Sequence, residues 1–152
     1  MTPMSGKTTY AKRSPYFVDI DDSLDYASDD HLWEMISQKD WEQLTLYKIE
    51  RLKLYLKDNY KDTDRLILFT HSYSEAKGVG AKVLGSFKVC AEDFFKRVKY
   101  LPEEESKISR RSRSLVIEAW NNASWAEELT HEEIENRIMT EAERLRLLNN
   151  NC

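Results

Sequence analysis

The chain has 152 residues, of which 41% are hydrophobic and 33% are charged, with only 4 glycines and 3 prolines. This length suits one domain with a buried core, and the scarcity of turn residues favours helices over a β-sandwich. The net charge of −4 argues against direct nucleic-acid binding, because no global positive field is present. We therefore expect a single all-α domain of five or six helices.

Targeting and redox signals are sparse. No apolar run approaches the roughly 20 residues of a membrane helix, so no membrane span is expected, and the polar N-terminus lacks the apolar region of a signal peptide. Cys90 and Cys152 form no disulfide framework. Reduced thiols in an intracellular protein are the expectation for two such cysteines.

The first half of the chain divides at about residue 28. Residues 1–28 are polar and are interrupted by Pro3 and Pro15, which predicts a disordered tail before a helical domain over residues 29–152. Apolar residues at helical spacing predict a short helix over residues 29–38 and a longer one over 40–60. The apolar run Arg65 to Phe69 is compatible with a helix turn or a strand, since periodicity cannot separate them.

The second half begins with a glycine-rich segment. Gly78, Gly80 and Gly85 predict a hinge near residues 78–85. A helix over residues 87–101 follows, with Phe94 and Val98 on its apolar face, and Pro102 with three acids starts a helix that runs to Trp120. Capping boxes at residues 124–127 and 130–133 introduce the last helical segment, which extends to Leu148.

Catalytic and metal-binding patterns are incomplete. Gly80 and Gly85 have the spacing of a phosphate loop, but the lysine that must follow is absent. His131-Glu132 begins like a zinc-binding helix, yet Glu135 stands where the second histidine is needed. The sequence therefore predicts a non-enzymatic protein without a metal or cofactor.

Trp125 is the strongest candidate for a binding residue. It follows a helix break, lies beside acids and lacks apolar neighbours within one turn, and a partly exposed Trp is a typical binding anchor. A packed helix junction is the alternative interpretation.

A basic cluster precedes this region, at Lys107, Arg110, Arg111 and Arg113. It is either a solvated helix face or a contact for an acidic partner. Ser112 and Ser114 are candidate phosphorylation sites, where added phosphate would reverse the charge of the cluster.

Several dispersed features of the C-terminal half together resemble those of one known protein family. They are Leu115 five residues before Trp120, the Glu127-Glu128-Leu129 group, the Arg137-Ile138 pair, a final Leu-rich helix, and upstream the stretch Lys96 to Pro102 followed by acids. In these positions the last third to half of the chain resembles the C accessory proteins of paramyxoviruses. The chain departs from that family in being acidic, whereas those proteins tend to be basic.

This resemblance implies a viral accessory protein and virulence factor in the host cytoplasm or nucleus. Such a protein would antagonise the interferon response by binding a host signalling protein of the STAT type, and it would modulate RNA synthesis by the viral polymerase. The implied partner-binding residues here are Trp120, Trp125, Glu127, Glu128 and Arg137.

A second resemblance covers residues 37–60. Ser37-Gln38-Lys39-Asp40-Trp41, Leu44 and Asn59-Tyr60 are similar to the A box of KRAB domains. This would imply a nuclear adaptor that recruits a corepressor in transcriptional repression. The usual Asp-Val-Met stretch is absent, and Lys53-Leu54-Tyr55-Leu56 occupies that region.

Overall fold

The computed structural model describes residues 1–2, 4–104 and 112–150, the last five of them by their backbone alone. Within these ranges the fold is a mixture of helices and short strands, so the expectation of an all-α domain is wrong. In chain order the elements are α1 (Lys7–Ala11), β1 (Phe17–Asp19), the 3-10 helix η1 (Ile20–Ser23), α2 (Asp30–Ser37), α3 (Trp41–Asn59), β2 (Ile67–Phe69), α4 (Tyr73–Gly78), β3 (Phe87–Val89), α5 (Ala91–Val98), α6 (Arg113–Asn122), β4 (Glu127–Leu129) and α7 (His131–Asn150).

The four strands form two separate parallel pairs. Strand β1 pairs with β2, with Val18 opposite Leu68, and β3 pairs with β4, with Lys88 opposite Glu128. Parallel neighbours need a long crossover connection. The first crossover contains α2 and α3, and the second contains α5 and α6.

The residues expected to form a disordered tail are part of the packed domain, so that expectation is also wrong. They form α1, β1 and η1, and Val18 and Ile20 are buried. The hydroxyl of Tyr10 donates to the backbone carbonyl of His131 at 3.1 Å, which joins α1 to the start of α7. Some of the polar residues that suggested a disordered tail form hydrogen bonds within the domain. Thr8, for example, donates to Asp19 at 2.9 Å.

The helices of the first half agree with the sequence. Helices α2 and α3 confirm the predictions for residues 29–38 and 40–60, and each is capped by an aspartate. Asp29 accepts a hydrogen bond from the backbone of Leu32, and Asp40 accepts one from Gln43, as N-cap residues do. The run from Arg65 to Phe69, compatible from its sequence with a helix turn or a strand, contains strand β2.

Gly78 ends α4 where this helix packs on α3. A Cβ atom at Gly78 would lie 2.3 Å from the Cδ1 atom of Ile49 on α3, so the close approach of the two helices depends on the missing side chain. The expected hinge over residues 78–85 stays a prediction.

The second half shows a systematic departure from the expected helices. The expected helix over residues 87–101 is instead β3 followed by α5, and residues 127–129 form β4. Of the helix expected from Pro102 to Trp120, the part from Arg113 is observed as α6, and residues 105–111, with Lys107, Arg110 and Arg111, lie outside the described residues. The capping box at Thr130 and Glu133 is confirmed, since each side chain binds the other's backbone amide.

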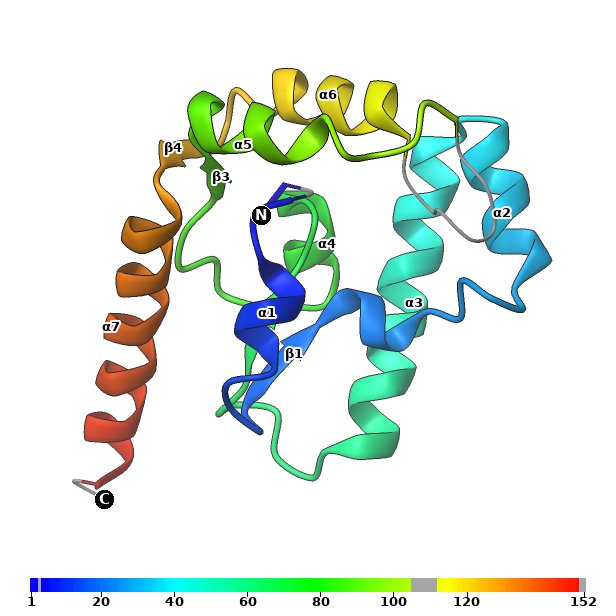
Figure 1. Cartoon of the computed structure of the whole chain (residues 1–152). Coiled ribbons are helices and arrows are strands. Elements are labelled where there is room, and N and C mark those ends of the chain that lie inside the picture. The colour runs from blue at the N-terminus through cyan, green and yellow to red at the C-terminus, as the bar shows by residue number, and fades with distance from the viewer. Residues whose placement is uncertain (3, 105–111, 151–152) are drawn as a thin grey trace.

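Helices α5 and α6 lie across one end of the molecule, and α7 runs along one side (Figure 1). The largest hydrophobic cluster joins these helices to the N-terminal segment and to both strand pairs. Phe94 on α5 is fully buried in this cluster and stacks on Trp120 of α6, with 5.1 Å between the ring centroids.

Phe94 and Phe95 provide a matched test of this core. We expect Phe94→Ala to lower the free energy of unfolding by about 3–5 kcal/mol, because it removes a fully buried ring and leaves a cavity. Phe95→Ala, at a neighbouring position that is 47% exposed, should cost clearly less. Urea denaturation measures both, and equal losses would contradict this assignment of the core.

Candidate functional site

Polar side chains gather where the first strand pair ends. Asp19 is the last residue of β1 and Asp21 follows it, while Thr70 and His71 follow β2. Because the two strands are parallel, their carboxyl ends lie at the same edge, which is where α/β folds commonly place ligand sites.

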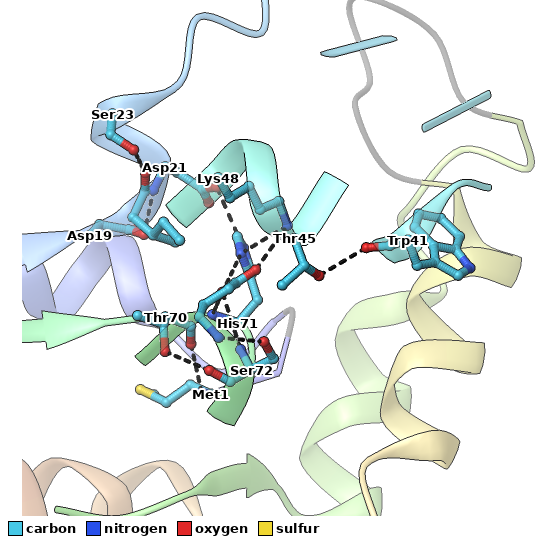
Figure 2. Close-up of polar contacts among 12 residues, drawn as sticks. Met1, Asp19, Asp21, Ser23, Trp41, Thr45, Lys48, Thr70, His71 and Ser72 are labelled. Atoms are coloured by element: carbon cyan, nitrogen blue, oxygen red, sulfur yellow. Dashed lines mark hydrogen bonds and ion pairs between the residues drawn. The ribbon is translucent and has the colours of Figure 1, made fainter. Parts of the chain in front are cut away.

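A continuous chain of polar contacts, here called the polar cluster, connects Tyr26, Asp21, His71, Lys48 and Glu75. The Tyr26 hydroxyl donates to Asp21 Oδ1 at 2.8 Å, and Nε2 of His71 lies 3.4 Å from the same oxygen. Lys48 Nζ lies 3.4 Å from His71 Nδ1 and 3.4 Å from Glu75 Oε1. Figure 2 shows His71 between Asp21 and Lys48, which come from η1 and α3.

Glu75 is fixed by the first turn of α4. Its Oε2 atom accepts hydrogen bonds from the backbone amides of His71 at 2.7 Å and Ser72 at 3.2 Å, and the Ser72 hydroxyl accepts one from the Glu75 amide. This capping box satisfies helix donors and holds a nearly fully buried carboxylate. Glu75 therefore has a fixed position, and Lys48 lies next to its carboxylate.

Burial sets the protonation of His71. Desolvation lowers the pKa of His71 well below its usual value, and the positive charges of Lys48 and Lys7 act in the same direction, whereas Asp21 opposes them. The imidazole is therefore neutral near pH 7. Its partners assign the proton to Nε2, which donates towards Asp21, and leave Nδ1 to accept from Lys48.

The N-terminal amine is close to the same region. The amine of Met1 donates to the carbonyl of Thr70 at 2.8 Å, one residue before His71 (Figure 2). Burial lowers the pKa of this amine from 8.0 to about 5.

A hollow of about 330 Å³ opens above the polar cluster between α3 and α6, and we call it the α3–α6 hollow. Helix α3 lines it with a single face, at Trp41, Leu44 and Lys48, and α6 lines it with Leu115 and Ala119. The remaining residues around it are Thr2, Tyr26, Ile36, His71, Val116, Glu118, Asn122 and Trp125. Mostly apolar walls with a few polar groups are typical of binding pockets of this size.

Trp125 also borders a second, smaller hollow of about 120 Å³, whose lining includes Arg137 and Phe87. Arg137 pairs with Glu127 at 3.1 Å, and its guanidinium lies 6.0 Å from the centre of the Phe87 ring. The structure thus brings together three of the residues singled out from the sequence, Trp125, Glu127 and Arg137.

Glu128 and Trp120 have other surroundings. Glu128 accepts a hydrogen bond from the backbone amide of Ala91 at 2.9 Å, at the start of α5. Trp120 is half-buried, its indole donates to the carbonyl of Val89 at 2.8 Å, and Lys88 Nζ lies 4.2 Å from the ring centre. Trp120 thus packs in the core and exposed Glu128 binds the start of α5, and contact of either residue with a partner stays a prediction.

The two candidate phosphorylation sites differ in access. Ser112 is fully buried and caps α6, since its hydroxyl accepts from the Leu115 amide at 3.2 Å. Ser114 is exposed, although its hydroxyl lies 3.1 Å from that of Ser112.

Sequence reasoning missed the polar cluster entirely. Its members come from η1, the segment before α2, α3 and the start of α4, so no local spacing reveals them. The available signal was that both Phe17-Val18 and Leu66 to Phe69 are apolar runs followed directly by polar residues. Treating both runs as parallel strands would have placed Asp21 beside His71.

Comparisons with known protein families, with curated proteins and with solved structures found no match. Within the described ranges, no group of three His, Cys, Asp or Glu side chains could hold a metal ion. None of the helices there has both the length and the apolar character needed to cross a bilayer.

The protonation of His71 predicts a pH dependence of stability. Because its pKa is lower in the folded chain than in the unfolded one, the unfolded chain binds the proton first, and stability is lost as the pH falls below about 6.5. We expect protonation of His71 to remove up to about 1.4 kcal/mol of unfolding free energy between about pH 7.5 and 5.5, because pH 5.5 lies one unit below the pKa of the unfolded histidine. Urea denaturation at several pH values measures this loss.

His71→Gln provides the comparison, since glutamine can donate to Asp21 but does not titrate in this range. Its stability should change less with pH, whereas His31→Gln, at an exposed position, should follow wild type. A slope for His71→Gln equal to that of wild type would contradict the assignment.

Because Ser112 caps α6 and Ser114 does not, we expect substitutions at the two serines to differ in their effect on stability. Ser112→Ala should lower the unfolding free energy by about 1 kcal/mol through loss of the N-cap hydrogen bond, and Ser114→Ala should change it by less than about 0.5 kcal/mol. Thermal denaturation measures both variants, and a larger loss for Ser114→Ala would reverse the assignment.

Proposed function

We propose that this chain is a non-enzymatic interaction protein that binds a partner polypeptide at the α3–α6 hollow. The observation that carries the proposal is the position of two tryptophans on this one hollow: Trp41 is 43% exposed and Trp125 is 46% exposed. Large aromatic side chains left in solvent beside a concave apolar surface are typical binding anchors, because a partner can desolvate them completely.

The arrangement of the polar cluster supports binding rather than catalysis. A histidine that acts as a general base needs a free ring nitrogen within reach of its substrate. In the free protein, both ring nitrogens of His71 face partners in the described part of the chain, Asp21 and Lys48. No serine, threonine or cysteine side chain is hydrogen-bonded to this imidazole among the contacts of the described residues.

The surface next to Trp125 supplies the polar edge that an interface needs. Glu127 and Arg137 form an exposed ion pair there, and polar rims of this kind surround the apolar centre of many interfaces. Exposed pairs contribute little stability to the free protein, so their partners can be exchanged when another chain binds.

The resemblance to paramyxovirus C proteins suggests the partner. We propose a host signalling protein of the STAT type, bound in the host cytoplasm so that the interferon response is antagonised, with the viral polymerase as a further partner. Of the residues on which the KRAB-like alternative depends, Leu44 is buried in the cluster between α2 and α3, and Trp41 is exposed. Because Trp41 also borders the α3–α6 hollow, its exposure does not favour the KRAB-like alternative over the first proposal.

Pull-down from interferon-treated cells tests this proposal. Wild type should recover a STAT protein, and Trp41→Ala and Trp125→Ala should each reduce recovery at least about tenfold, as expected when an anchor worth more than 1.4 kcal/mol is removed. Tyr100→Ala is the matched control, because Tyr100 is an aromatic residue with 80% exposure outside both hollows.

Circular dichroism of each variant establishes that the helices persist. Recovery that is unchanged in both tryptophan variants would remove the hollow as the binding surface, and recovery of nuclear corepressors in place of a STAT protein would favour the KRAB-like alternative.

A further inference from the structure

The floor of the α3–α6 hollow contains a buried cation with unused hydrogen-bonding capacity. Lys48 is only 13% exposed, and its ammonium group carries three N–H donors. Its partners within the described residues are His71 Nδ1 and Glu75 Oε1, both at the long distance of 3.4 Å. One donor of Lys48 therefore lacks a protein acceptor in that part of the chain, and Lys48 borders the hollow.

The walls of the hollow call for an apolar occupant. Trp41, Leu44, Leu115 and Ala119 surround the space above Lys48, and its volume of about 330 Å³ is at the lower end of the range of ligand pockets. An occupant that satisfies both the walls and the floor must carry an apolar group and a hydrogen-bond acceptor close together.

The charges around His71 restrict how an acceptor can bind. With neutral His71 and a neutral Met1 amine, the charges that are buried or largely buried around it are Lys7 on α1, Asp19 and Asp21 at the end of β1 and in η1, Lys48 on α3, and Glu75 on α4. The acids outnumber the bases by one. An added carboxylate would increase this imbalance unless His71 took up a proton at Nδ1.

Protonated His71 and Lys48 would present two donors side by side. Their nitrogens are 3.4 Å apart in the free protein, and a carboxylate can accept from two neighbouring donors through its two oxygens. The carboxylate would separate the two positive groups, and its charge would be offset by the proton on His71, so that the net charge of the cluster stays the same.

We propose that the hollow binds the C-terminal residue of a partner chain, with its apolar side chain between α3 and α6 and its carboxylate bridging Lys48 and His71, which takes up one proton from solvent. Among the groups of a polypeptide, the C-terminal residue fits because it joins an apolar side chain to a carboxylate, whereas Asp and Glu side chains lack the apolar part. This inference rests on the proposed function in placing the partner in the same hollow.

The test uses a pair of peptides that differ only in charge: acetyl-Gly-Gly-Leu with a free carboxylate and the same peptide with a C-terminal amide. Nuclear magnetic resonance of the indole N–H groups follows binding to the full chain up to about 10 mM peptide, which detects dissociation constants in the millimolar range. The acid should bind at least about tenfold more tightly than the amide.

The four indoles include their own controls. Signals of Trp41 and Trp125 should move, because both border the hollow. Those of Trp33 and Trp120 should stay, because their indoles donate to the carbonyls of Tyr26 at 2.7 Å and Val89 at 2.8 Å.

Three variants separate the parts of the proposal. Lys48→Met should remove the preference for the acid, while Lys53→Met, on the exposed side of the same helix, should keep it. Since Lys48→Met leaves Glu75 without its cation, Ala119→Leu is a further variant that fills the hollow without touching the polar cluster. It should weaken acid and amide alike.

Proton uptake gives a separate readout. The affinity of the acid should rise as the pH falls from about 7.5 to 6, by up to about tenfold per pH unit, and His71→Gln should abolish this rise. Calorimetry in buffers of different ionisation enthalpy should report about one proton taken up per acid peptide bound and none for the amide.

Several outcomes would overturn the inference. Equal affinity for acid and amide would exclude the carboxylate contact, and isocaproate binding as tightly as the peptide would exclude a partner chain as the occupant. No movement of the Trp41 and Trp125 signals with any peptide would exclude the site. A different result would contradict the proposed function: recovery of a STAT protein that is unchanged when the two tryptophans are replaced.

Discussion

The pairing of β1 with β2 is the contact on which the rest of the molecule depends. It is only three residues long, yet it separates two hydrophobic clusters. Phe17 and Phe69 face the large cluster with α5 and α7, whereas Val18 faces the cluster under α3. A two-stranded pair is marginal by itself, so burial of both faces stabilises it. The same pairing aligns the carboxyl ends of the two strands, after which Asp21 and His71 follow.

The polar cluster follows from this alignment and restricts the fold in turn. Buried polar groups are costly unless each is hydrogen-bonded or paired. Asp21, His71, Lys48 and Glu75 come from four segments, and their mutual contacts are made only when η1, α3 and α4 are all docked. Such a network opposes alternative arrangements of the helices, since each would leave a charge buried without its partner.

Helices with strong local signals were predictable. Thr130 acts as the cap that the sequence indicates, and Asp29 and Asp40 cap the two helices expected in the first half, because capping depends on residues within one turn. The strands of three residues were not predictable, since the alternation of apolar and polar residues cannot be recognised over so short a run. Phe87 to Val89 was therefore predicted as part of a helix. The neighbours of Trp125 left an exposed anchor and a packed junction as alternatives, and the side chain is 46% exposed. The contacts of Lys48 with His71 depend on residues 23 positions apart, so local spacing could not indicate them.

Trp125 lies between the two hollows and contributes to the wall of each. A single indole cannot adopt its best rotamer for both occupants unless those rotamers coincide. Occupants that select different orientations of this indole would therefore be thermodynamically linked, and the resulting loss in affinity would be the same in either order of binding. Two partners that use this surface would sense each other through one side chain without touching.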